Sequence, residues 1–327
     1  MGIPELTPVF AAFAASAAGL RLLLAPRVTA WFLDHPNERS LHAAPVPRTG
    51  GLGIMPPLLA AILLVGGNGL LVALAFGLML LSLLDDWRDL PAGVRLSGHL
   101  CASSVFVLAF LPATNWIALL LLVLAVGWMI NLYNFMDGAD GLAGGMTILG
   151  FCTYAAAAWL AGNLALCVTN LCVAASAGAF LLFNFPPARL FMGDAGSVPL
   201  GFMAAALGLL GWRDGIWPLW FPLVAFAPFV LDASITLLRR AIRGERVWQA
   251  HRSHYYQRLV LTGWSHRRLA AAEYGLMLMS GGAALLALRQ PIRLQLLILT
   301  ALAVVYILSG LAVDRRWRAS QRMTSSH

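Results

Sequence analysis

The chain has 327 residues, of which 60% are hydrophobic and only 11% are charged. Soluble domains carry about a quarter charged residues, so this composition excludes an ordinary soluble globular protein and predicts lipid as the main solvent. The net charge is +8 and every basic residue is arginine; in so apolar a chain, cytoplasmic loops and anionic lipid headgroups explain this charge better than nucleic acid does.

Apolar stretches recur along the whole chain, and we predict eleven transmembrane helices from their length. They fall at residues 6–30, 51–66, 70–84, 97–112, 115–133, 146–161, 164–183, 197–212, 216–239, 267–288 and 293–313. The first stretch lacks a basic n-region, so we interpret it as a retained span rather than a signal peptide. The predicted fold is therefore an all-α polytopic transmembrane bundle, forming a single domain over residues 1–327.

The loops between these spans divide the charges unequally between the two membrane faces. Most arginines fall on the face that receives loops 28–50, 85–96, 134–145, 184–196 and 240–266. The positive-inside rule makes this face cytoplasmic and the N-terminus periplasmic, and predicts a multi-pass protein of the bacterial inner membrane. Most carboxylates fall on the same face, which predicts a functional site in the cytoplasmic loops.

Two adjacent carboxylates, Asp85 and Asp86, directly follow the third predicted span. Ionised carboxylates at such a depth are costly unless they meet a metal, cations or water. The pair is either an acidic helix end at the interface or a set of hard oxygen ligands or a base for the reaction of a Mg2+-bound phosphate. We favour the second interpretation because the chain places few acids elsewhere.

A second acidic segment follows the fifth span, with Asn134, Asp137 and Asp140 three residues apart among glycines. On a helix this spacing places the three on one broad face. If the glycines unwind the segment, backbone N–H groups become available to a phosphate or nucleotide. An EF-hand is excluded because the Glu at its twelfth position is missing.

A third segment begins after Pro186-Pro187, which end the preceding helix. Asp194 then stands where a helix N-cap residue would stand, and alone it would be as well explained as a cap. Beside two other acidic segments on the same face, a metal ligand is the better interpretation. Phe191, three residues earlier, either stacks on a base or anchors the loop.

Two further segments complete the cytoplasmic face. The basic loop 240–266 interleaves His251, Arg252 and His254, which suits a phosphate clamp or a lipid-headgroup site, and residue types alone do not separate the two. The segment from Asp34 to Gly53 is broken by prolines and glycines and predicts a shaped loop that leads into the second span.

Together these five segments resemble the polyprenyl-phosphate N-acetylhexosamine-1-phosphate transferase family, glycosyltransferase family 4, which includes MraY, WecA and WbpL. The resemblance covers about residues 34–259, with all five segments in the family's order. The form His251-Arg-Ser-His254-Tyr-Tyr is most similar to the WbpL branch, which initiates O-antigen or related surface glycan synthesis, and it departs from the corresponding MraY and WecA blocks.

The resemblance implies a reaction in which undecaprenyl phosphate attacks the sugar-linked phosphorus of a UDP-N-acetylhexosamine. The products are undecaprenyl-pyrophosphoryl-sugar and UMP, and the implied cofactor is Mg2+, with Mn2+ as the alternative. The implied partners are these two substrates and membrane lipids, without nucleic acid, and a homodimer is left open.

The resemblance also implies roles for the residues that match the family's motifs. The implied catalytic residues are Asp85, Asp86 and Asp137. The implied metal ligands are Asp194 and Asn134. The implied nucleotide-binding residues are Asp140 and Phe191. The implied phosphate-binding residues are Arg95, His251, Arg252 and His254. Two acids within the spans, Asp232 and Glu273, are expected to be structural partners of nearby arginines.

Three alternative functions fit the sequence less well. A MraY-like phospho-MurNAc-pentapeptide transferase shares the family but is disfavoured by the histidine block. A non-catalytic lipid transporter would place polar residues at mid-membrane and often has paired halves, which are not seen. A CDP-alcohol phosphotransferase needs Asp-Gly-x-x-Ala-Arg, and the string that begins at Asp137 lacks that arginine.

Overall fold

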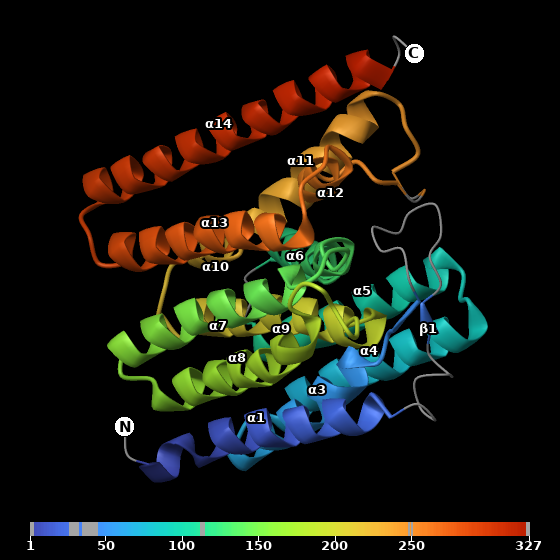
Figure 1. Cartoon of the computed structure of the whole chain (residues 1–327). Helices are drawn as coiled ribbons and strands as arrows, with labels where there is room; N and C mark the ends of the chain where they lie inside the picture. The colour runs from blue at the N-terminus through green and yellow to red at the C-terminus, as the bar shows by residue number, and fades with distance from the viewer. Residues whose placement is uncertain are drawn as a thin grey trace.

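The computed structural model describes residues 3–25, 33–34, 45–111, 115–247, 249 and 251–324. Its described part is a bundle of helices with one two-stranded antiparallel pair, β1 (Leu33–Asp34) and β2 (Val46–Pro47). Most helices run side by side along one direction, with the N-terminus and the C-terminus at opposite ends of the bundle (Figure 1). The predicted polytopic helical bundle is confirmed.

The helices follow one another in the order α1 (Ile3–Leu23), α3 (Gly50–Leu64), α4 (Gly69–Arg88), α5 (Ala92–Phe110), α6 (Trp116–Phe135), α7 (Leu142–Leu160), α8 (Leu164–Asn184), α9 (Asp194–Arg213), α10 (Trp220–Ala225), α11 (Ala227–Ile242), α12 (Tyr255–Leu261), α13 (His266–Ala287) and α14 (Ile292–Thr324). Within the described ranges, nine of them are long and apolar enough to cross a membrane. Each of the eleven predicted stretches contains helix.

The ninth predicted span, 216–239, is wrong as a single helix. The structure has two helices there, α10 and α11, which meet at Phe226. Pro228 stands in the first turn of α11 and has no N–H to donate to a preceding carbonyl, so a continuous helix would lose a hydrogen bond at this point. A second difference is α12, a seven-residue helix within the segment predicted as a basic loop.

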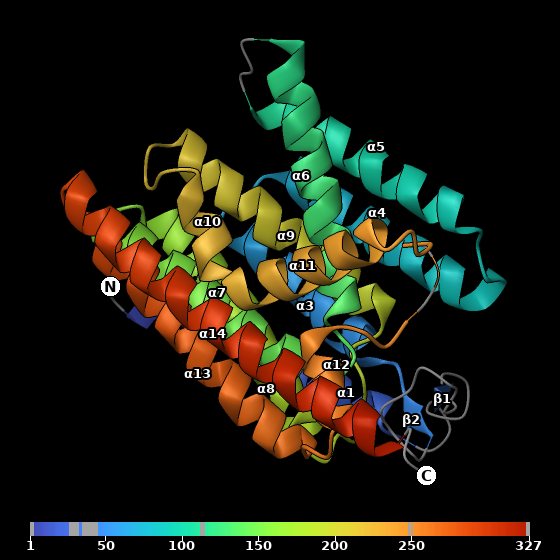
Figure 2. The same cartoon turned by 90° about the horizontal axis from the view of Figure 1, so that it is seen from above.

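The bundle has a buried centre and a lipid-facing edge. In the most apolar stretch of α9, 83% is buried inside the protein, whereas in the corresponding stretch of α14 only 6% is buried. Accordingly α14 lies along the outside of the molecule, beside α13 (Figure 2). The first turn of α9, which carries Asp194, therefore begins in the interior of the protein rather than at its periphery.

One end of the bundle gathers the irregular segments. The strands β1 and β2, the short helix α12 and the C-terminus all lie at this end, which we call the C-terminal face (Figures 1 and 2). Because successive spans alternate in direction, α4 and α6 end at this face and α9 begins there. The predicted gathering of acidic segments on one face is thus reproduced by the helix directions.

Candidate active site

The two adjacent carboxylates near the end of α4 differ in their environments. Asp85 is buried; its Oδ1 accepts the backbone N–H of Leu90 at 2.8 Å and its Oδ2 accepts an N–H of Arg95 at 2.9 Å. The helix ends where Asp89 adopts a left-handed conformation with φ 50°, which brings Leu90 back toward Asp85. Asp86, in contrast, is exposed. Asp85 therefore orders this turn, and Asp86 is the member of the pair that solvent reaches.

Arg95, predicted to meet a lipid phosphate, stands in the first turn of α5 with 41% of its side chain exposed. A guanidinium has five N–H donors, so its pairing with Asp85 leaves donors for a second anion. The charges of both Asp85 and Arg95 act on Asp194 at the start of α9. The turn after α4 and the beginning of α9 therefore face the same site.

The predicted metal ligands Asn134 and Asp194 come together, from the last turn of α6 and the first turn of α9. The Asn134 Nδ2–H group donates to Asp194 Oδ2 at 3.2 Å. Ser197, one turn into α9, donates its hydroxyl to Asn134 Oδ1 at 2.9 Å. Ser197 had no predicted role, and its position three residues after Asp194 on a helix was the available signal.

Glycine lets α9 approach α6 closely enough for these contacts. A Cβ atom at Gly201 would lie 2.8 Å from the Cβ of Tyr133 and 2.9 Å from the backbone of Met129 and Ile130. Any side chain there would push the two helices apart. The close crossing therefore sets the distance between Asn134 and Asp194.

Asp137, in the turn after α6, faces the same cluster. Its carboxyl group accepts the backbone N–H of Gly193 and lies near Asp194 and Arg48. Burial, followed by the repulsion of Asp194, holds the pKa of Asp137 well above its usual range, although Arg48 and the Gly193 amide oppose the shift. Two half-buried carboxylates are thus held close together, an arrangement that favours a proton or a cation between them.

Backbone pairing joins the loop before α3 to the loop before α9. The Phe191 N–H donates to Pro47 O at 2.8 Å, and the Gly50 N–H donates to Phe191 O at 2.9 Å. A Cβ atom at Gly51 would lie 2.3 Å from the Gly196 nitrogen, so glycine is needed for this approach. The pairing brings Arg48 to the acidic cluster, a role that the sequence did not reveal.

Residues 35–44, which are half of the predicted loop from Asp34 to Gly53, lie outside the described residues. The half-buried Phe191 is held by its backbone pairing, which is compatible with the predicted anchoring of the loop.

Asp140 lies at a neighbouring position, at the end of the same turn as Asp137. Its Oδ2 accepts the Ala188 N–H at 3.0 Å and its Oδ1 lies 3.0 Å from His266 Nδ1. Burial would raise the pKa of Asp140, but the hydrogen bonds and charge of His266 and the Ala188 amide outweigh burial and lower it. His266 was not predicted, because it is 126 residues away in the chain.

The two histidines of the basic loop lie beside each other, with ring centroids 4.9 Å apart. His251 Nδ1 lies 2.8 Å from the Ser253 hydroxyl, and burial, then the charges of His254 and Arg240, lower the pKa of His251 to about 4. His254 is buried and stacks on Phe135, which follows Asn134 in the chain. The histidine loop therefore reaches the acidic cluster through the end of α6.

Asp232 in α11 holds the short helix α12 in place. Its Oδ1 accepts the Tyr255 N–H at 2.9 Å and its Oδ2 accepts the Tyr256 N–H at 3.0 Å. The same Oδ1 lies 3.3 Å from Nδ1 of His254. The expectation that Asp232 would be the partner of an arginine is wrong, since its carboxylate is taken up by backbone amides, Thr236 and His254.

The nearby arginines pair instead with Asp314 of α14. Arg239 donates to both of its carboxylate oxygens, and Arg258 donates to Oδ1 at 3.0 Å. Glu273, the other acid expected to pair with an arginine, has no such partner in the part of the chain that the structure describes, so this expectation is wrong too. The exposed Arg252 lies beside the histidines and is available to solvent.

The donor set of the acidic cluster fits a hard divalent cation. Across the described ranges, no three His, Cys, Asp or Glu side chains form a complete metal site. Mg2+ is usually held by one or two carboxylates and completed by substrate phosphates and water. Asp137 and Asp194 supply an incomplete oxygen set of that kind, and their mutual repulsion favours a cation. Asn134 turns its amide nitrogen toward Asp194 and its oxygen toward Ser197, so it would become an oxygen ligand only after its amide group turns over.

Comparison with known proteins finds a matching family model and several related enzymes. Residues 69–211 match the family model described as glycosyl transferase family 4. The chain is 31% identical to a probable undecaprenyl-phosphate N-acetylglucosaminyl 1-phosphate transferase of Bacillus subtilis (strain 168), over 74% of this chain and 73% of that protein.

Two further relatives carry related names. A decaprenyl-phosphate N-acetylglucosaminephosphotransferase of Mycobacterium leprae (strain TN) is 31% identical, over 79% of this chain and 77% of that protein. A phospho-N-acetylmuramoyl-pentapeptide-transferase of Geobacillus thermodenitrificans (strain NG80-2) is 28% identical, over 71% of this chain and 81% of that protein.

Proposed function

The chain belongs to glycosyl transferase family 4, and from that premise we propose that it transfers an N-acetylhexosamine 1-phosphate from a UDP-sugar to undecaprenyl phosphate. The main support for this proposal is that Asp137 and Asn134 both lie beside Asp194, at the ends of membrane helices. A site at the ends of membrane helices lets a lipid-linked phosphate meet a soluble nucleotide-sugar at the membrane surface.

In the proposed reaction an oxygen of the lipid phosphate attacks the phosphorus that bears the sugar. The new P–O bond joins the two phosphates, the bond to the uridine phosphate breaks, and UMP leaves with the bonding electron pair. A phosphate monoester is largely ionised near pH 7, with a second pKa of about 6, so the attack does not require a strong base. We therefore favour a one-step displacement over a covalent aspartyl-phosphate.

Asp194 would hold Mg2+, or Mn2+ in its place, together with Asn134 once the amide of Asn134 turns its oxygen toward the ion. Asp137, assigned to catalysis from the sequence, would join them because it lies near Asp194. The bound ion would supply charge neutralisation for the pyrophosphate, which is the main requirement of phosphoryl transfer. Asp86, exposed beside this cluster, would face the lipid phosphate, and Asp85 would position Arg95, whose remaining N–H donors suit a phosphate oxygen.

The nucleotide would lie on the other side of the acidic cluster. Asp140 and Phe191 are assigned to the uridine, and their positions on paired loops support that assignment. His251, Arg252 and His254 are assigned to the pyrophosphate. A His251 pKa of about 4 keeps this ring neutral near pH 7, so it would act there as a hydrogen-bonding group rather than as a cation.

We further propose the biological setting that follows from this reaction. The protein would act at the bacterial inner membrane, with the C-terminal face in the cytoplasm, and would initiate O-antigen or related surface glycan synthesis. Support for the WbpL branch comes from the sequence of the histidine loop.

The test is a reconstituted assay. Purified protein is incubated with undecaprenyl phosphate, Mg2+ and a panel of UDP-sugars: UDP-N-acetylglucosamine, UDP-N-acetylfucosamine, UDP-N-acetylquinovosamine and UDP-MurNAc-pentapeptide. We expect lipid-dependent UMP release with at least one of the first three. Release only with the pentapeptide would favour the muramoyl transferase, and release with none of the four would refute the proposal.

A further inference from the structure

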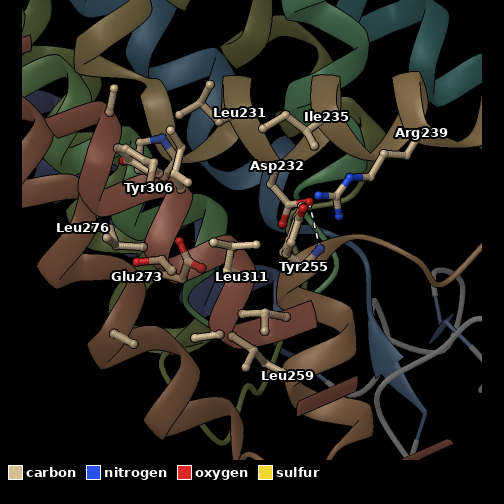
Figure 3. Close-up of a pocket in the computed structure, with 18 of the residues that line it drawn as sticks. Leu231, Asp232, Ile235, Arg239, Tyr255, Leu259, Glu273, Leu276, Tyr306 and Leu311 are labelled. Carbon is tan, nitrogen blue, oxygen red and sulfur yellow. Dashed lines mark hydrogen bonds between the residues drawn. The ribbon is translucent and has the colours of Figure 1, made fainter. Parts of the chain in front are cut away.

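A second site lies away from the acidic cluster, between α11, α12, α13 and α14. It is a cavity of about 650 Å3, lined mostly by apolar side chains such as Leu231, Ile235, Leu276 and Leu311 (Figure 3). Ligand pockets typically measure roughly 300–1,000 Å3. The cavity borders Tyr255 of α12 but contains none of the residues assigned to the transfer reaction.

The carboxyl group of Glu273 in α13 is the unexplained feature of this cavity. The residue is 9% exposed and lines the cavity, into which its side chain projects (Figure 3). In the described part of the protein, no donor lies within hydrogen-bonding distance of this carboxyl group. A buried carboxyl group without a partner is costly in an apolar environment, so the site lacks a group that would complete it.

The cavity wall adds negative charge, and the arginine on it is already paired elsewhere. Asp232 lines the same cavity, and its charge acts on Glu273. Arg239, at the edge of the cavity, is already bound by both carboxylate oxygens of Asp314. The Tyr306 hydroxyl, also on the wall, pairs with Ser280 at 2.7 Å. An ordinary acyl chain would fill the space but would leave Glu273 unpaired.

The position of Glu273 limits the shape of the missing group. It lies seven residues inside α13 from His266, which is roughly 10 Å along the helix axis at 1.5 Å per residue. A phospholipid ammonium, tied to a phosphate at the interface, would have to leave the headgroup region to reach it. A single-chain amine can place its ammonium at this depth and its hydrocarbon along Leu231 and Leu276.

We propose that this cavity binds a single-chain amphiphilic amine, whose ammonium pairs with Glu273 and whose apolar chain fills the space between α11 and α14. A fatty acid would bring a like charge beside Glu273 and Asp232. A fatty alcohol would supply one hydrogen bond but no charge. The site goes beyond the transfer reaction, and its binding test does not depend on that activity.

The test uses the full-length protein in detergent at pH 9, with oleylamine as the probe. Binding is measured by isothermal titration calorimetry and by the rise in apparent unfolding temperature. Oleyl alcohol and oleic acid serve as matched chains with other headgroups. We expect saturable one-to-one binding of oleylamine, at least about tenfold tighter than either of the other two.

Two variants locate the site. Glu273→Gln keeps the shape but removes the charge, and we expect it to weaken oleylamine binding by about tenfold or more. Gly310→Leu adds a side chain beside Tyr255, whose ring would lie 3.7 Å from the new Cβ, and should block the cavity. Gly77→Leu, at a lipid-facing position with nothing within 4 Å, is the matched control and should bind normally.

Equal binding by wild type and Glu273→Gln would overturn the proposal, and so would oleic acid binding as tightly as oleylamine. Unchanged binding by a folded Gly310→Leu would also overturn it. If that variant does not fold, the comparison of wild type with Glu273→Gln decides the matter by itself.

Discussion

At the scale of single residues, the candidate site depends on two carboxylates that repel each other. Asp137 and Asp194 approach one another because a turn and a helix start meet, and burial together with this repulsion raises the pKa of Asp137. Asn134 and Arg48 moderate the repulsion without removing it. We expect a bound cation to reduce this repulsion between the two carboxylates.

Asp194→Asn and Asp137→Asn are each expected to lower UMP release by about a hundredfold or more, because each removes a charge that the phosphates' counterion would need. Both variants should keep the apparent unfolding temperature of the wild type or raise it, since a repulsion is removed. Asp214→Asn, at an exposed position after α9, is the control and should keep full activity. Full activity in both site variants would refute the assignment.

The raised pKa of Asp137 also predicts a pH dependence of stability. The folded protein binds this proton more tightly than the unfolded chain, so the contribution is fully present below the usual value of 3.8 and is lost as pH rises through the raised pKa. With EDTA present, the apparent unfolding temperature of wild type minus that of Asp137→Asn should fall over this range. Added Mg2+ should reverse the fall; an unchanged difference would contradict the shift.

At the scale of the elements, two residues outside the site, one in α9 and one in α11, determine where the helices that carry it lie. Gly201 lets α9 cross α6 closely, and Asp232 caps α12, which at seven residues is too short to be stable alone. Neither residue is assigned to a substrate. Each sets where a functional side chain lies, Asp194 in one case and His254 in the other.

Gly201→Ala is expected to lower activity although it touches no substrate. Its methyl group would meet the backbone of α6 and separate Asn134 from Asp194, and overpacking of this kind costs about 1–3 kcal/mol. Thermal unfolding and UMP release would both be measured. Gly77→Ala, where a Cβ meets nothing within 4 Å, is the matched control. Equal activity of the two variants would show that the close crossing is unimportant.

Asp232→Asn is expected to reduce turnover by roughly tenfold, because an amide has one acceptor oxygen and cannot cap both amides of α12 and face His254. The KM for the nucleotide-sugar should rise more than that for the lipid, since the histidine loop is assigned to the pyrophosphate. Asp232→Glu should restore part of the activity. Equal rises in both KM values would indicate a general structural loss instead.

At the scale of the whole molecule, the direction of α14 decides the orientation of the C-terminus. This helix has 33 residues, which at 1.5 Å each is roughly 50 Å, longer than the hydrocarbon core of about 30 Å. Its end therefore extends beyond the membrane on the C-terminal face. That end carries Arg315, Arg316, Arg318 and Arg322.

The positive-inside rule then predicts a cytoplasmic C-terminus. A C-terminal green fluorescent protein fusion should fluoresce, and an alkaline phosphatase fusion at the same place should be inactive. A phosphatase fusion in the turn at Asn68, on the opposite face, should be active. The reverse pattern would place the candidate site outside the cytoplasm and contradict the proposed nucleotide-sugar substrate.

Length and hydropathy, which are local properties of each span, were enough to predict the membrane class, the places of the apolar helices along the chain and the face on which the acids gather. They did not give the number of long helices, since nine in the described residues are long and apolar enough to cross a membrane and eleven spans were predicted. The sequence also identified the segments that resemble a family. It missed the break at Phe226 and the helix α12, since a proline near a span end and a basic loop admit more than one local structure.

Which acids share a site depends on helix packing. Asn134 and Asp194 are 60 residues apart, and their contact depends on how α6 and α9 pack, which no local pattern encodes. The same holds for His266 beside Asp140 and for Asp314, rather than Asp232, beside the arginines. The sequence gives the charge of each side chain directly. The partner of that charge depends on which helices pack together.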